Sequence, residues 1–407
     1  MGLADALAHP PEREQRRPEH PKGWEPGVAW DPTTGSGEII VESDTAPDPA
    51  IWEHLIADWG LDPQRCSVVP GSVQIRAWDA NVGNGEIRRL RYYRATLQGR
   101  AAVHDQADVD ALCKQVMKRK PVKHASATTV ADMPRALVVA LSDWQVGKGE
   151  GDGTEGTVAR LTAARDALAG RLRELRKVGR PVDTVYLIGL GDLVEGCEEH
   201  YASQTFTTDL DRTQQCRVVR RLILSSVDAV LDTERVVLAA VPGNHGENRR
   251  NGKAFTNVAT DNDDLSTVEQ VGEIMAANPD RYGHVATYLA DDFTMALDVH
   301  GVVCAFTHGH TARKSGHAAA VLEDWWRGQV MGRQAVADAD ILTAGHRHHL
   351  VVSEASGRTF LQAPAMDPGS HWFTSSSGAH SPAGLLTYCV GRDAYGARGW
   401  GDMAVLS

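Results

Sequence analysis

Residues 235–247 read RVVLAAVPGNHGE, and this stretch decides the fold. The apolar run at 236–241 is too short for a buried helix and fits a strand covered on both faces. A Pro-Gly pair ends the run, and Asn244 and His245 follow at its carboxyl end, where open α/β sheets place their chemistry. A Pro-Gly-Asn turn is ordinary on its own. The stretch therefore predicts a functional strand end only if similar ends recur.

Four more apolar runs end in the same way. They are followed by SDWQVG at 142–147, GDLVE at 191–195, THGH at 307–310 and GHRH at 345–348. Residues i and i+2 of an extended segment point to one face, so His346 and His348 can face the same place. Any single Asp or His after a strand is usually a helix cap or a structural residue. Five such ends on successive strands predict one site.

Helical patterns separate the predicted strands. Residues 157–177 place apolar side chains on one face of a helix, and a second helix is expected from about 209 to 231. Buried strands that alternate with helices are typical of an α/β fold with parallel strands.

The motifs DxQxG, GDxxE, GNHGE, HGH and GHxH, in this order, resemble those of the calcineurin-like metallophosphoesterases over about residues 135–362. The resemblance implies a four-layer α/β/β/α sandwich with two divalent metal ions at the strand ends. Two ions roughly 3.5–4 Å apart can hold a bridging hydroxide and clamp a phosphate for in-line attack.

The resemblance also assigns a role to each motif residue. One ion would be held by Asp143, Gln145, Asp192 and His348. The other would be held by Asp192, Asn244, His308 and His346, so Asp192 would bridge the two ions. His245 would be the catalytic histidine that protonates the departing oxygen.

Three positions depart from the usual family pattern. Gln145 stands where relatives usually have histidine, Glu195 replaces the frequent aspartate of GDxxD, and Gly246 separates His245 from Glu247. A glutamine oxygen is a harder and weaker ligand than imidazole, so this oxygen-rich set should favour manganese over zinc.

Within the family, the motifs look most like those of the SbcD-type DNA repair nucleases. The segments DWQVGK and GSHWF, the latter at 369–373, resemble phage-encoded homologues. We therefore expect a divalent-metal phosphodiesterase, in the first place a DNA exonuclease or endonuclease. A phosphatase or phosphodiesterase for a small nucleotide, and a nucleic-acid-binding module with a vestigial metal site, are the alternatives. The SbcD-type resemblance also implies a homodimer or an ATPase partner.

Basic residues near the motifs are candidates for binding phosphates of DNA. They are Arg249, Arg250, Lys253, Arg313 and Lys314, together with Arg88, Arg89, Arg91 and Arg94 of the segment IRRLRYYRATL at 87–97. The two tyrosines of that segment could stack on bases. The alternatives are solvated surface charges and tyrosines in a core.

Charge and composition divide the chain. The net charge is −11, but residues 64–124 hold 12 Lys and Arg against 5 Asp and Glu. We expect a mobile arm at 1–46, a small α+β domain with a basic hairpin at 47–130, and the metallophosphoesterase domain at 131–407. No apolar run reaches membrane-spanning length and no signal-peptide core is present. These features predict a cytoplasmic protein, in the host cell if phage-encoded, without a membrane partner.

Overall fold

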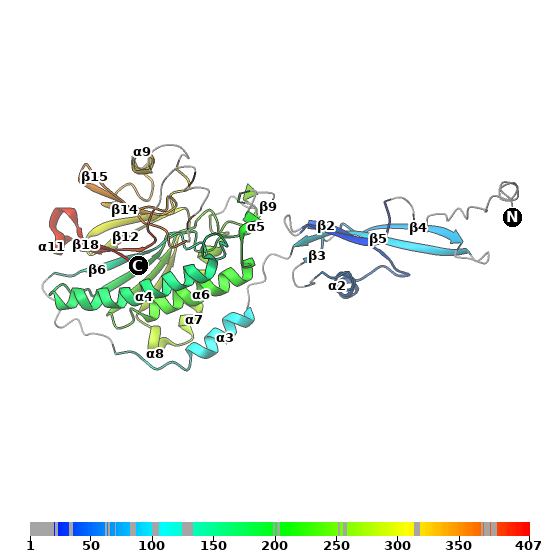
Figure 1. The fold of residues 1–407 in the computed structure, drawn as a ribbon, viewed down its shortest axis with the longest axis horizontal. Helices are drawn as coiled ribbons and strands as arrows, with labels where there is room; N and C mark the ends of the chain where they lie inside the picture. Colours follow the sequence, from blue (N-terminus) through cyan, green and yellow to red (C-terminus); the bar gives the residue numbers. More distant parts are fainter. Residues whose placement is uncertain are drawn as a thin grey trace, which may run out of the picture. The chain divides into compact units, whose positions relative to one another are not determined.

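Figure 1 shows the computed structural model, which divides the chain into two compact units, residues 1–103 and 104–407. The structure describes residues 20, 23–31, 36–61, 63, 66–69, 71–81, 87–99, 106–123, 133–197, 200–201, 204–250, 253–254, 259–312, 318–367, 369, 375 and 381–407.

The first unit contains an antiparallel sheet and one helix. Its strands are β1 (Gly27–Asp31), β2 (Ser36–Glu42), β3 (Cys66–Val68), β4 (Gln74–Asn81) and β5 (Ile87–Gly99), with β5 between β2 and β4. Helix α2 (Pro49–Asp58) begins where the Asp48 carboxylate accepts from the Ile51 N–H at 2.9 Å. Trp52 and Ile56 of this helix pack on Ile39 of the sheet.

Two predictions made from the sequence concern this first unit. The predicted hairpin is confirmed as β4 and β5, which pair antiparallel. The expected mobile arm at 1–46 is wrong for its last part, because residues 27–31 and 36–42 form β1 and β2. The physical reason is the apolar run Ile39–Val41, which is buried and pairs with the centre of β5.

The second unit contains two sheets that face each other. The first has the order β11-β8-β7-β6-β17-β18. Its strands are β6 (Ala136–Leu141), β7 (Thr184–Gly189), β8 (Arg235–Ala240), β11 (Val285–Leu289), β17 (Leu385–Val390) and β18 (Trp400–Leu406). The strands β6, β7, β8 and β11 are parallel, and β17 runs antiparallel to β6.

The second sheet has the order β12-β13-β14-β16-β15. Its strands are β12 (Thr294–Val299), β13 (Val302–Thr307), β14 (Ile341–Ala344), β15 (Val351–Ala355) and β16 (Arg358–Gln362). The strands β13, β14 and β16 are parallel. A separate two-stranded ladder joins β9 (Arg249–Arg250) to β10 (Lys253–Ala254).

Helices α4 (Gly153–Lys177), α6 (Arg212–Asp228) and α7 (Asp263–Ala276) cover the outer face of the first sheet, and α9 (Ala318–Met331) covers that of the second (Figure 1). The other described helices of this unit are α3 (Gln106–Val116), α5 (Gln204–Thr207), α8 (Pro279–Tyr282) and α11 (Arg392–Tyr395), the last followed by a 3-10 turn at Gly396–Arg398. Among the described residues, no helix is both long and apolar enough to cross a membrane.

Alternating side chains of each strand build three apolar layers. Val139 belongs to the core between the first sheet and α4, α6 and α7. Its neighbour Val138 points to the opposite face and lies in the core shared with Phe306 of the second sheet. Leu342 lies in the core on the far face of that sheet, with Trp326 of α9. The order is therefore α/β/β/α, and the four-layer sandwich implied by the motifs is confirmed.

Helix α3 belongs to this second unit. Val109, Leu112 and Val116 are buried in the core that α7 shares, and Asp108 accepts from Arg220 at 2.8 Å. The boundary therefore lies before residue 104, whereas we expected it near residue 130. The prediction assigned this helix to the small domain at 47–130, but its apolar face packs on the second unit.

This packing makes truncations at the two boundaries differ. A chain that begins at residue 104 should keep the stability of the second unit. A chain that begins at residue 131 loses the three aliphatic side chains of α3, and should lose on the order of 5 kcal/mol of unfolding free energy. Urea unfolding of the two truncated proteins measures the difference; equal stabilities would contradict the assignment of α3.

Candidate metal centre

The five motifs meet at one place because the strands that precede them end at facing sheet edges. Asp143, Asp192 and Asn244 follow the parallel strands β6, β7 and β8 of the first sheet. His308 and His346 follow the parallel strands β13 and β14 of the second sheet. We call Asp143, Gln145, Asp192 and His348 the first half-site, and Asp192, Asn244, His308 and His346 the second half-site.

The second half-site is the better formed. One ligand atom each of Asp192, His308 and His346 lies within 4.8 Å of the others. The Nε2 atom of His308 is 3.0 Å from Asp192 Oδ2 and 3.0 Å from Asn244 Oδ1. Its Nδ1 atom lies 2.8 Å from the carbonyl oxygen of Leu190. An imidazole that donates from Nδ1 to a carbonyl directs Nε2 at a metal, as metal-ligating histidines usually do.

His200 orients the amide of Asn244. The Nδ2 atom of Asn244 lies 3.0 Å from His200 Nε2. Because an amide nitrogen only donates, this contact leaves Asn244 Oδ1 turned toward His308 and Asp192. His200 was not predicted. It lies in the segment between GDLVE and α5, where no strand or motif marked it.

In the first half-site, His348 lies between the carboxylates of Asp143 and Asp367. His348 Nε2 lies 3.2 Å from Asp143 Oδ1, and His348 Nδ1 lies 3.6 Å from Asp367 Oδ1. The backbone N–H of His346 donates to Asp143 at 3.0 Å. Asp367 also pairs with the ammonium of Lys148. Sequence reasoning missed both Asp367 and Lys148: Asp367 follows β16 outside any motif, and Lys148 is the last residue of DWQVGK.

Five of the seven predicted ligands have backbones in the left-handed region. The φ angles are 50° at Asp143, 43° at Gln145, 54° at Asp192, 70° at His346 and 58° at His348. This conformation costs roughly 1–3 kcal/mol for each non-glycine residue, and such strain gathers at functional sites.

Glycines at the motifs permit close approach. A Cβ on Gly243 would lie 2.2 Å from the backbone nitrogen of Asp192, and a Cβ on Gly345 would lie 2.3 Å from Ser142 Oγ. Gly191 has a φ of 87°, and a Cβ there would lie 2.6 Å from Gly243. The glycines of GDLVE, GNHGE and GHRH are therefore needed for the loops to pack together.

Asp264 holds together the two loops that carry the GDLVE and GNHGE motifs. Its carboxylate accepts from the N–H groups of Asp192 and Leu193 at 2.9 Å, and from Gly243 at 3.0 Å. Burial, and then the nearby Asp192 carboxylate, raise the pKa of Asp264 to about 7. Asp264 lies in the first turn of α7, which begins at Asp263 after the cap Asn262.

His245 is held in place through its backbone N–H group and through its Nδ1 atom. Its backbone N–H donates to Asp192 Oδ1 at 2.8 Å, and its Nδ1 atom lies 2.8 Å from the carbonyl oxygen of Glu195. The Glu195 carboxylate lies 3.3 Å from the same Nδ1 atom and accepts from Tyr201 at 2.6 Å. Burial would lower the pKa of His245, but the carboxylates of Asp192 and Glu195 raise it to about 9.

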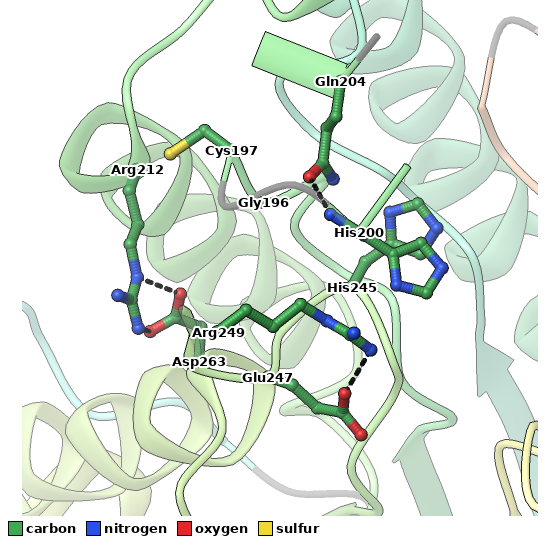
Figure 2. Close-up of a pocket in the computed structure, with 9 residues that line it drawn as sticks. All are labelled: Gly196, Cys197, His200, Gln204, Arg212, His245, Glu247, Arg249 and Asp263. Carbon is green, nitrogen blue, oxygen red and sulfur yellow. Dashed lines mark hydrogen bonds and ion pairs between the residues drawn. The ribbon is translucent and has the colours of Figure 1, made fainter. Parts of the chain in front are cut away.

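A small pocket opens beside His245 (Figure 2). Its lining is polar and consists of Gly196, Cys197, His200, Gln204, Arg212, His245, Glu247, Arg249 and Asp263. Arg249 forms an ion pair with Glu247, and Arg212 binds both carboxylate oxygens of Asp263 at 2.6 and 2.8 Å. Of the predicted phosphate-binding residues, Arg249 thus lies at the site.

The other predicted basic residues near the motifs are Arg250, Lys253, Arg313 and Lys314. Arg250 and Lys253 pair through their backbones in the β9–β10 ladder. Arg313 and Lys314 lie outside the described residues, as do residues 370–373 of the GSHWF segment.

The arginines of β5 are divided between the two faces of the sheet. Arg88 and Arg94 pair with Glu42 and Glu38, and Arg89 with Asp79 on the opposite face. Arg91 donates to the carbonyl oxygen of Asp44 at 3.2 Å. The tyrosines Tyr92 and Tyr93 are 2% and 4% exposed. Stacking of bases on these tyrosines is therefore excluded, and their core position, the alternative we considered, is found.

The donor set fits divalent cations. Two buried carboxylates, an amide oxygen and three imidazoles converge, and the strained backbone holds them there at the cost of stability. Oxygen and imidazole ligands together suit manganese, iron or zinc. Turns with only a structural role do not need this backbone strain or these close glycine contacts. The arrangement of the residues therefore supports a metal centre.

Comparisons with known proteins add little. No family profile and no curated protein matches this chain. A predicted phosphoesterase of Streptococcus pneumoniae TIGR4 is 13% identical, covers 63% of this chain and 84% of its own, and has a TM-score of 0.27. Vps29 of Entamoeba histolytica in complex with Zn²⁺ is 15% identical, with 67% and 99% covered and a TM-score of 0.27. An archaeal phosphodiesterase is 12% identical, with 66% and 99% covered and a TM-score of 0.29. Scores this low carry no argument about function, which rests on the site.

The role of Asp264 can be tested by two substitutions. Asp264→Ala leaves four buried N–H groups, those of Asp192, Leu193, Val194 and Gly243, without this acceptor and should cost about 3 kcal/mol of unfolding free energy. It should also weaken metal binding, because Asp192 and Asn244 would no longer be held together. Asp264→Asn keeps one acceptor oxygen and should lose less. Chemical unfolding and metal counting measure both effects; metal binding unchanged in Asp264→Ala would refute this role.

Proposed function

We propose that this protein is a divalent-metal-dependent phosphodiesterase. The observation that carries the proposal is the pair of half-sites that share Asp192, with His245 held beside them by Glu195. The motif resemblance described above supports the same activity. Shared carboxylates and a neighbouring titratable group are what the hydrolysis of a phosphodiester requires.

The chain's own residues divide the work. Asp143 and His348 would hold one cation, Asn244, His308 and His346 the other, and Asp192 both. Divalent ions, when bound, would polarise the phosphate and lower the pKa of water. The backbone contact from His245 to Asp192 and the ring contact to Glu195 hold this imidazole in one orientation. A protonated His245 in this position can give its proton to the departing oxygen.

Manganese is the expected activating metal. The half-sites offer carboxylate and amide oxygens beside imidazoles and no thiolate, a set that suits manganese better than zinc. Of the six cysteines, none is among the residues of the two half-sites.

Substitutions of His245 and of Asp192 should have different effects on turnover and on metal binding. His245→Ala should lower turnover of bis-p-nitrophenyl phosphate by roughly 10²–10⁴-fold, as expected for loss of a general acid, and keep its metal. Asp192→Ala removes the shared ligand and should lose metal itself. Counting bound manganese in both variants beside the rate decides the roles. A metal-depleted His245→Ala protein would overturn them, and a wild-type protein that binds metal without hydrolysing diesters would sink the proposed activity.

We further propose DNA as the substrate. The pocket beside His245 has a polar lining that includes Arg249, one of the residues that we expect to bind phosphate. The exposed ion pairs of Arg88 and Arg89 contribute little to stability, so phosphates can replace their carboxylate partners at small cost.

Removing residues 1–103 tests the substrate. The shortened protein should hydrolyse bis-p-nitrophenyl phosphate at the full-length rate, because both half-sites and α3 remain. Cleavage of DNA should fall, and DNA binding by the full chain should weaken steeply with salt, as counterion release requires. Charge reversal of Arg88 and Arg89 in the full chain is the matched control. Unchanged DNA cleavage in both proteins would leave the first unit without a role in substrate binding.

A further inference from the structure

Lys148 is a buried cation that the proposed chemistry does not use. The residue is 8% exposed, and its ammonium forms an ion pair with Asp367. It also donates to Gln145 Oε1 at 3.1 Å. Lysine is almost never buried unless it is paired. Its two partners are the predicted metal ligand Gln145 and the carboxylate beside the ligand His348.

The contact with Lys148 decides which way the amide of Gln145 faces. An ammonium has three donors and no acceptor, so the amide atom beside it must be the oxygen. The amide nitrogen then lies 3.3 Å from His245 Nε2, a contact that this imidazole can accept only in its neutral form. The only atom of Gln145 that could ligate a metal is therefore hydrogen-bonded to a cation, and a metal on its second lone pair would be repelled by the ammonium charge.

We infer that Lys148 prevents Gln145 from ligating a metal in the first half-site. The two half-sites consequently differ in metal affinity. This inference rests on the proposed function and makes its metal complement specific. The second half-site keeps four ligands, namely Asp192, Asn244, His308 and His346. The first keeps three, namely Asp143, Asp192 and His348, of which Asp192 is shared.

Asp367 balances the charge of this arrangement. Its carboxylate pairs with Lys148 on one side and approaches His348 Nδ1 at 3.6 Å on the other. Removal of Lys148 alone would leave a buried carboxylate that could itself attract a cation. The double variant Lys148→Met/Asp367→Asn removes one positive and one negative charge. It thereby frees the Gln145 oxygen without changing the net charge.

The test is a manganese titration of the metal-stripped full-length protein, with bound ions counted and free Mn²⁺ followed by its EPR signal. The wild type should bind one ion tightly and a second roughly 10-fold or more weaker. In Lys148→Met/Asp367→Asn the weaker step should be roughly 10-fold tighter than in the same variant carrying Gln145→Ala, because the loss of Asp367 beside His348 is common to both proteins; the tight step should be unchanged. Lys148→Arg keeps a cationic donor and should retain the unequal steps.

Gln145→Ala provides the matched control. If Lys148 withholds this side chain, its loss should leave both binding steps of the wild-type protein unchanged. Added to the double variant, the same substitution should abolish the gain at the first half-site. Thermal unfolding checks that each variant is folded. If the double variant does not fold, the metal-binding steps of Gln145→Ala alone test the inference.

Two results would overturn the inference. One is a wild-type protein that binds two ions with equal affinity, and the other is loss of the weaker ion in Gln145→Ala. Neither touches the proposed activity, because both are read from metal binding without substrate. A protein that binds no manganese at either half-site would count against the proposed function itself.

Discussion

The candidate metal centre depends on one buried carboxylate that is not among its predicted ligands. Asp264 accepts hydrogen bonds from backbone N–H groups at the ends of β7 and β8, and so ties the loop of Asp192 to the loop of Asn244. Backbone donors at the ends of parallel strands have no partner within the sheet, and burying them unpaired would be costly. A single side chain from the start of α7 satisfies them and fixes the distance between ligands from two strands.

The second sheet is joined to the first by a similar device. The backbone N–H of His346 donates to the Asp143 carboxylate, so a ligand of one sheet is the acceptor for the loop of the other. The left-handed backbones at both residues make this contact possible. Strain of this kind persists only where surrounding contacts over-determine it. The two β layers and the metal ligands therefore support each other, and neither is an addition to a finished fold.

The sequence predicted what is local and periodic. The strands before Asp143, Asp192, Asn244, His308 and His346 were visible as apolar runs, and the residues directly after them formed motifs. Partners from elsewhere in the chain could not be read in this way. Asp264 opens a helix, Asp367 follows a strand without a motif, and His200 lies in a connecting segment; each reaches the site only through packing. The same limit explains α3, which we placed in the small domain although Leu112 and Val116 pack in the core of the second unit.

The order of strands in the first sheet has a consequence for biosynthesis. β6, which leads to Asp143, is flanked by β7 and by β17, although β17 is separated from it by most of the second unit. Contacts between distant segments form late, and domains fold as units while the chain leaves the ribosome. The nascent chain thus cannot complete its central sheet until β17 has emerged. Any activity that depends on Asp143 would therefore arise only after nearly all of the second unit is free to fold.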